Sequence, residues 1–113
     1  MIKTTKGELP VYFGMNALAR FGDLTDKTMT QVLDTLSDMS SDMSTLKMSD
    51  MLAFIYSGFT EGARREKIEC QIESVEMIGD MIDDDGDLIT KVMTAYSKQS
   101  VPEDAVESDG KKK

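Results

Sequence analysis

Residues 46–67 read LKMSDMLAFIYSGFTEGARREK, the one long segment whose apolar spacing, start signal and glycine positions all agree on a helix. At 100° per residue, its small and apolar residues fall on one face. That face consists of Met51, Leu52, Ile55, Gly58, Phe59, Gly62 and Ala63. The opposite face carries Asp50, Ser57, Thr60 and Arg64. With Ser49 as its candidate N-cap, the segment predicts a central packing helix.

Gly58 and Gly62 lie one turn apart on the buried side of this helix. A glycine inside a helix costs about 0.5–1 kcal/mol relative to alanine. A pair of them on a packing face therefore predicts that another backbone passes very near. Gly58 and Gly62, together with Ile55 and Phe59, are the predicted helix-packing residues.

Phe54 differs from its neighbours because the same wheel projects it away from the apolar face, beside Glu61 and Arg65. We therefore expect Phe54 to be exposed, and we include it with Arg65 among the candidate partner-binding residues. A simpler explanation of Arg64 and Arg65 is that cations in the last turn favour the negative end of a helix.

Ten of the 113 residues are methionines, whose flexible side chains re-pack against varied apolar partners. Methionines at helical spacing are more simply explained as core residues. This group contains Met29, Met39, Met51, Met81 and Met93. Met43 and Met48 instead lie among serine and aspartate residues that disfavour helix, and we predict them to be exposed and partner-binding.

Shorter segments on both sides of the central helix also have helical spacing. The expected helices are residues 15–22 ending at Gly22, one capped by Thr25 or Asp26, one capped by Ser74, and one from Leu88 to Tyr96. The second of these places Met29, Val32, Leu33, Leu36 and Met39 in a core stripe. A loop is expected between it and the central helix, from Ser40 to Met48.

Residues 67–73 alternate Ile68, Cys70 and Ile72 with polar residues, which predicts a short half-buried strand. It could pair with the N-terminal arm, residues 1–13, which is expected to form a strand or a hairpin.

The predicted fold is mainly α, with four to five short helices and a small two-stranded β element. These elements form a single domain over residues 1–98. Residues 99–113 have almost no core material and are expected to be a disordered acidic tail that ends in lysines.

The chain has no histidine, no tryptophan and one cysteine, which removes the commonest general base and the commonest zinc ligand. We therefore predict no enzyme activity, no catalytic residue and no cofactor. The acidic turn at residues 83–87 does not fit a calcium loop. With Gly86 at loop position six, Met81 and Val92 would occupy the first and twelfth ligand positions, and neither has an oxygen in its side chain. No metal site is expected.

Residues 67–87 contain eight acids and one base, and are either a solubilising face or a docking surface for a basic partner. The net charge of −8 repels nucleic acid and anionic lipid. No apolar run approaches 18 residues, so no membrane span is expected. A single cysteine and the lack of a signal peptide favour a reducing cytoplasm.

Several segments, taken in order, resemble a known family. A strand-like arm runs into VYFGMNALARFGD, and a polar and leucine-containing helix, LAFIYSGFTEGARRE and SVEMIGDMID follow. This order resembles the tail assembly chaperones of long-tailed bacteriophages, over about Leu9 to Tyr96.

The resemblance implies a mainly helical, non-enzymatic protein of the bacterial host cytoplasm that is absent from the mature virion. Such a protein binds the tape measure protein, keeps it soluble and helps tail tube protein to assemble around it. Self-association is left open. Many members also have a longer frameshifted form, and Gly110 to Lys113 can be encoded by a slippery purine run. The alternative is a generic protein interaction module or a structural virion component of prophage origin.

Overall fold

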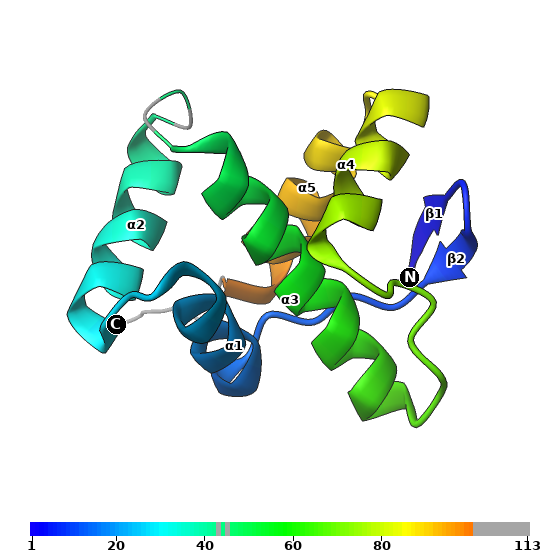
Figure 1. Cartoon of the computed structure of the whole chain (residues 1–113), viewed down its shortest axis with the longest axis horizontal. Coiled ribbons are helices and arrows are strands. Elements are labelled where there is room, and N and C mark those ends of the chain that lie inside the picture. Colours follow the sequence, from blue (N-terminus) through cyan, green and yellow to red (C-terminus); the bar gives the residue numbers. More distant parts are fainter. Residues whose placement is uncertain (43, 45, 101–113) are drawn as a thin grey trace, which may run out of the picture.

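A computed structural model describes residues 1–42, 44 and 46–100. Its elements in chain order are β1 (Ile2–Thr4), β2 (Gly7–Leu9), α1 (Met15–Thr25), α2 (Met29–Ser41), α3 (Met48–Glu66), α4 (Val75–Asp84) and α5 (Leu88–Ser100) (Figure 1). Over these residues the fold is mainly α, with five helices and one two-stranded antiparallel sheet, which confirms the predicted fold class. Gln99 and Ser100 belong to α5, so the helix continues past the predicted domain boundary, and the rest of the predicted tail lies outside the described residues.

Helix α3 runs through the middle of the molecule (Figure 1). Helices α1 and α2 lie on one side of it, whereas α4 and the hairpin lie on the other. Two apolar clusters fill these two sides, and α3 contributes Met51, Ile55 and Phe59 to one and Ala53 and Phe54 to the other. The central helix is therefore buried on more than the single face that its sequence predicts.

The predicted exposed position of Phe54 is wrong. Its side chain is 0% exposed and belongs to the cluster that also contains Phe21 of α1. Ser57, predicted on the polar face, is also buried, and its hydroxyl donates to the Ala53 carbonyl oxygen over 2.8 Å. The wheel misplaces both residues because a second layer, α1, covers the face that the sequence marks as polar.

The close approach predicted from Gly58 and Gly62 is confirmed. The extended residues 10–13 cross α3 at this point, and the Tyr12 amide donates to the Gly58 carbonyl oxygen over 3.0 Å. A Cβ added at Gly62 would lie 2.7 Å from the Val11 amide nitrogen, and one at Gly58 would lie 2.8 Å from the Val11 side chain. Only residues without a side chain let the arm lie this close to the helix.

The helix ends agree with the sequence in part. Ser74 caps α4 as predicted, because its side chain accepts a hydrogen bond from the Met77 amide. The cap of α2 is Thr28, which forms a reciprocal capping box with Gln31, rather than Thr25 or Asp26. The N-cap of α3 is Lys47 rather than Ser49. Helix α1 does not end at Gly22 as predicted, because it continues through the buried Gly22 to Thr25.

The strand predicted at residues 67–73 is not present. This segment is a turn followed by irregular structure, with Ile72 buried and Ile68 48% exposed. Both strands of the sheet come from the N-terminal arm, where Ile2 pairs with Leu9 across a tight turn. Gly7, at φ 98°, supplies the left-handed backbone that this turn needs. A local hairpin closes a shorter loop than pairing with residues 67–73 would.

Candidate functional site

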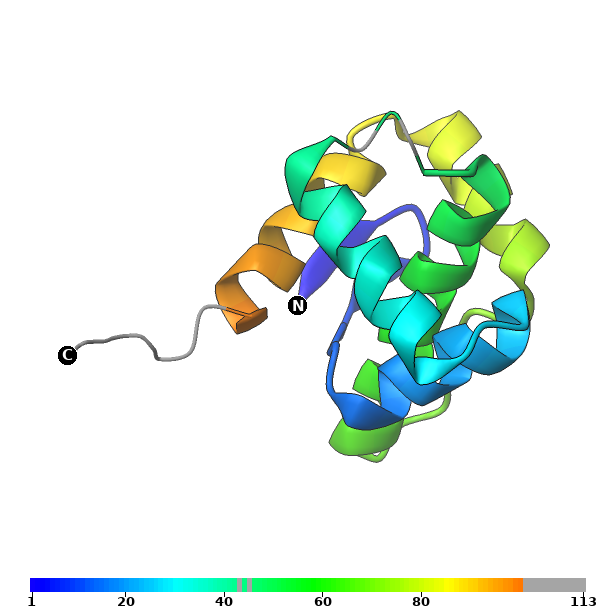
Figure 2. The ribbon, with the colours of Figure 1, turned by 90° about the vertical axis from the view of Figure 1, so that its left-hand side faces the viewer.

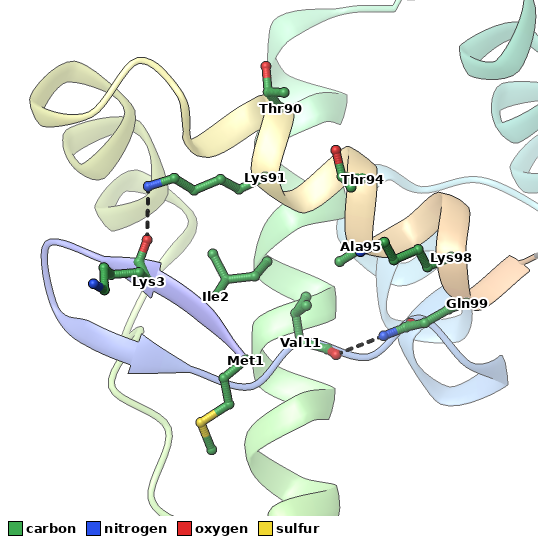
Figure 3. A pocket seen from close by; sticks show the side chains of 10 residues that line it. All are labelled: Met1, Ile2, Lys3, Val11, Thr90, Lys91, Thr94, Ala95, Lys98 and Gln99. Atoms are coloured by element: carbon green, nitrogen blue, oxygen red, sulfur yellow. Dashed lines mark hydrogen bonds between the residues drawn. The ribbon is translucent and has the colours of Figure 1, made fainter.

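A groove of about 480 Å³ lies between the N-terminal hairpin and α5 (Figure 3). Helix α5 presents Lys91, Ala95 and Lys98 along one side, because residues three and four positions apart share a helical face. The groove as a whole is lined by Met1, Ile2, Lys3, Val11, Thr90, Lys91, Thr94, Ala95, Lys98 and Gln99. We call it the basic groove, because its lining among the described residues has three lysines and no acid, in a chain of net charge −8.

The walls of the basic groove are tied together by hydrogen bonds (Figure 3). Gln99 accepts from the Phe13 amide over 2.7 Å and donates to the Val11 carbonyl oxygen over 3.0 Å, which fixes the end of α5 to the arm. At the other end, the Lys91 ammonium donates to the Lys3 carbonyl oxygen over 3.1 Å. The groove is therefore held open between two fixed walls.

Two of the three lysines are available to a ligand. Lys91 also donates to Asp85 over 2.9 Å, and this hydrogen bond is the largest cause of the lowered pKa of the Asp85 carboxyl. Lys3 and Lys98 are exposed, and neither takes part in an ion pair within the described ranges. Exposed lysines line this groove together with the apolar residues Ile2, Val11 and Ala95, which suits a ligand with carboxylates and short aliphatic groups.

A second surface lies on α2, where Met29 and Leu33 are 57% and 52% exposed. We call this pair the apolar edge of α2. Of the predicted core stripe, Val32 and Met39 are buried and Leu36 is half-buried, so the stripe is wrong for Met29 and Leu33. Helix α2 therefore leaves one margin of its stripe in solvent. Figure 2 shows α2 in front of the other helices.

Glu61 is the one buried acid within the described part of the chain, at 1% exposure. Arg64 holds it through two hydrogen bonds, of 2.8 Å from Nε and 2.6 Å from Nη2. Hydrogen bonding from Arg64 is the largest influence on the pKa of Glu61 and lowers it, whereas burial raises it. A hydrogen bond from Asn16 and the charge of Arg20 also lower this pKa. Because both oxygens are occupied by the protein's own cations, Glu61 has a structural role.

The predicted partner-binding residues do not form one site. Met48 is 66% exposed, as expected, whereas Phe54 is buried and Met43 lies outside the described residues. The guanidinium of Arg65 stacks on the Tyr12 ring at 4.0 Å, which fixes the arm against the end of α3. The predicted packing residues Ile55, Gly58, Phe59 and Gly62 are all buried.

The acidic stretch at residues 67–87 is solvated for most of its length. Its exposed acids are Glu69, Glu73, Glu76, Asp80, Asp83, Asp84 and Asp87. No group of histidine, cysteine and acidic side chains suited to a metal ion occurs among the residues that the structure describes. Within the same ranges, no helix has both the length and the apolar character to cross a membrane.

Sequence reasoning missed both the basic groove and the apolar edge. The lysines of the groove are 88 positions apart between Lys3 and Lys91, so no local pattern connects them. The signal for the apolar edge was present, since the stripe of α2 is wider than one helix neighbour can cover. Comparisons with protein-family models, with curated proteins and with solved structures gave no match.

Proposed function

We propose that this protein is a non-enzymatic tail assembly chaperone of the bacteriophage type. It would bind the tape measure protein in the host cytoplasm and promote assembly of the tail tube around it. The proposal rests on the order of segments between Leu9 and Tyr96 that resembles this family, and on a chain that lacks histidine. It needs, in addition, a surface that a long helical partner can use.

The apolar edge of α2 is the observation that carries this proposal. Met29 and Leu33 are one helical turn apart and more than half exposed, although each could contribute about 1 kcal/mol on being fully covered. A helical partner that lays an apolar stripe along α2 would cover both at once, as in helix-in-groove recognition. Exposed methionine suits this purpose because its side chain adapts to different neighbours.

Co-expression with the protein encoded directly downstream tests the proposal. The soluble fraction of that protein should rise in the presence of this chain. Leu33→Gln should remove much of the rise, because it places an amide in the apolar contact. Asp34→Gln is the matched control, since Asp34 is the neighbouring exposed residue outside the apolar edge. Equal soluble fractions with and without this chain would contradict the chaperone function.

The alternative of a structural virion component predicts a different location. A chaperone should be present in the lysate and absent from purified particles, whereas a structural component should copurify with them. Mass spectrometry of purified particles separates the two, and stoichiometric recovery of this chain would contradict the proposal.

A further inference from the structure

We propose that the basic groove is the docking site of the acidic segment that directly follows α5 in this chain, residues 101–109. This inference does not depend on the proposed function. It rests on the charges of the groove, on the composition of the segment and on where α5 ends.

The basic groove and residues 101–109 carry opposite charges. The segment reads VPEDAVESD and contains four acids and no base. Within residues 1–42, 44 and 46–100, the lining of the basic groove has three lysines and no acid, and Lys3 and Lys98 are exposed. Charge-assisted hydrogen bonds between ammonium and carboxylate groups are about twice as strong as neutral ones. The groove is thus complementary in charge to this segment.

The apolar residues of the segment match the groove as well. Valine and alanine residues lie among its acids, at positions 101, 105 and 106. The groove places the apolar side chains of Ile2, Val11 and Ala95 between its lysines (Figure 3). A chain lying in it can therefore cover apolar atoms while its carboxylates reach the ammonium groups.

Length and direction permit the docking. The lining residues of α5 run from Thr90 to Gln99, a distance of about 14 Å at 1.5 Å per residue. An extended chain of nine residues spans about 30 Å, which is enough to turn back and retrace the helix. Pro102 disfavours helical backbone at the residue before it and so favours a change of direction at this point.

The direct tether gives this occupant an advantage over any free ligand. A short flexible connection corresponds to an effective concentration in the millimolar range. Ion pairs and apolar contacts that would be too weak to hold a free ligand can then hold the segment, and salt should weaken this docking because the charges are near the surface.

Paramagnetic relaxation in the full chain tests the proposal. A nitroxide is attached to Ser108→Cys in a Cys70→Ser background, and amide signals are compared with those of the reduced label. We expect strong broadening at Lys3, Lys91 and Thr94, and its loss in 0.5 M salt, a concentration at which the Debye length is about 4 Å.

The matched variants change charge inside and outside the groove. Lys3→Glu with Lys98→Glu should remove the broadening. Lys6→Glu with Lys47→Glu has the same change of charge at exposed residues outside the groove lining and should preserve it. Unchanged amide shifts away from the substituted sites establish that each variant is folded.

Two results would overturn the proposal. One is broadening confined to the end of α5, with no effect at Lys3 or Lys91. The other is measured in a mixed sample, in which the isotope-labelled chains carry no nitroxide and the unlabelled chains carry it. Broadening of Lys3 and Lys91 that persists at full strength in this mixture would mean that a second copy, rather than the same chain, fills the groove.

Discussion

The Phe54 ring stacks on the Phe13 ring, with centroids 4.4 Å apart and planes 9° from parallel. Phe21 and Tyr96 meet Phe54 edge-on, with centroids at 5.6 Å and 5.2 Å. Three aromatic rings, from the arm, α1 and α5, thus converge on the Phe54 side chain of α3. Phe54 joins the N-terminal and C-terminal parts of the chain to the central helix.

Replacing Phe54 by alanine should therefore reduce the free energy of unfolding by about 3–5 kcal/mol, the usual range for a buried phenylalanine. The measurement is chemical denaturation followed by circular dichroism. Met15→Ala is the control, because Met15 is 69% exposed and its loss should change stability by less than about 0.5 kcal/mol. Near-equal stabilities of the two variants would contradict the burial of Phe54.

Gly62→Ala should destabilise the fold by about 1–3 kcal/mol, because the new methyl group would meet the backbone of Pro10 and Val11. Gly79→Ala in α4 is the matched control. The nearest atom to its added Cβ is 3.8 Å away, so the gain in helix propensity should raise stability by about 0.5–1 kcal/mol. Thermal unfolding should shift in opposite directions for the two variants, and a shift in the same direction would rule out the close crossing of the arm.

Ser74→Ala should cost about 1 kcal/mol, because the hydroxyl of Ser74 accepts the hydrogen bond that begins α4. Ser49→Ala should have little effect, since α3 is capped at Lys47 and Ser49 lies inside the helix. Urea denaturation of the two single variants distinguishes the caps. A larger loss for Ser49→Ala would mean that α3 begins where its sequence suggests.

Acid should weaken the fold in part through Glu61. Its folded-state pKa lies below the ordinary value of 4.5, so its contribution to stability is complete above pH 4.5 and is lost as pH falls through the lower folded-state pKa. Glu61→Gln should lower stability at pH 7 by about 1–3 kcal/mol. Below pH 4.5 the difference between the two proteins should shrink. Parallel curves of stability against pH would show that Glu61 titrates normally.

The helices, and the close approach of another backbone to α3, could be predicted from the sequence because their signals are local. Gly58 and Gly62 report a neighbouring backbone directly, and Ser74 lies beside the amide that it caps. The position of Phe54 could not be predicted in this way. Whether a helical face is covered depends on partners distant in sequence, here α1 and Tyr96, and a wheel contains no information about them.

The basic groove and the apolar edge of α2 also differ in how far the sequence predicts them. The basic groove joins Lys3 to α5 across most of the chain, so it becomes visible only in the folded protein. The apolar edge of α2 follows from a stripe that is wider than its neighbours can cover, which the sequence contains but does not distinguish from core.

Amide hydrogen exchange of the copurified complex tests the proposal that another polypeptide covers the apolar edge of α2. Helix α2 lies at one side of the fold, with Met29 and Leu33 in solvent. We expect slower exchange in residues 29–41 of the complex than in the free protein, and a smaller effect for Leu33→Gln. Unchanged exchange throughout α2, in a complex whose protection lies elsewhere, would contradict it.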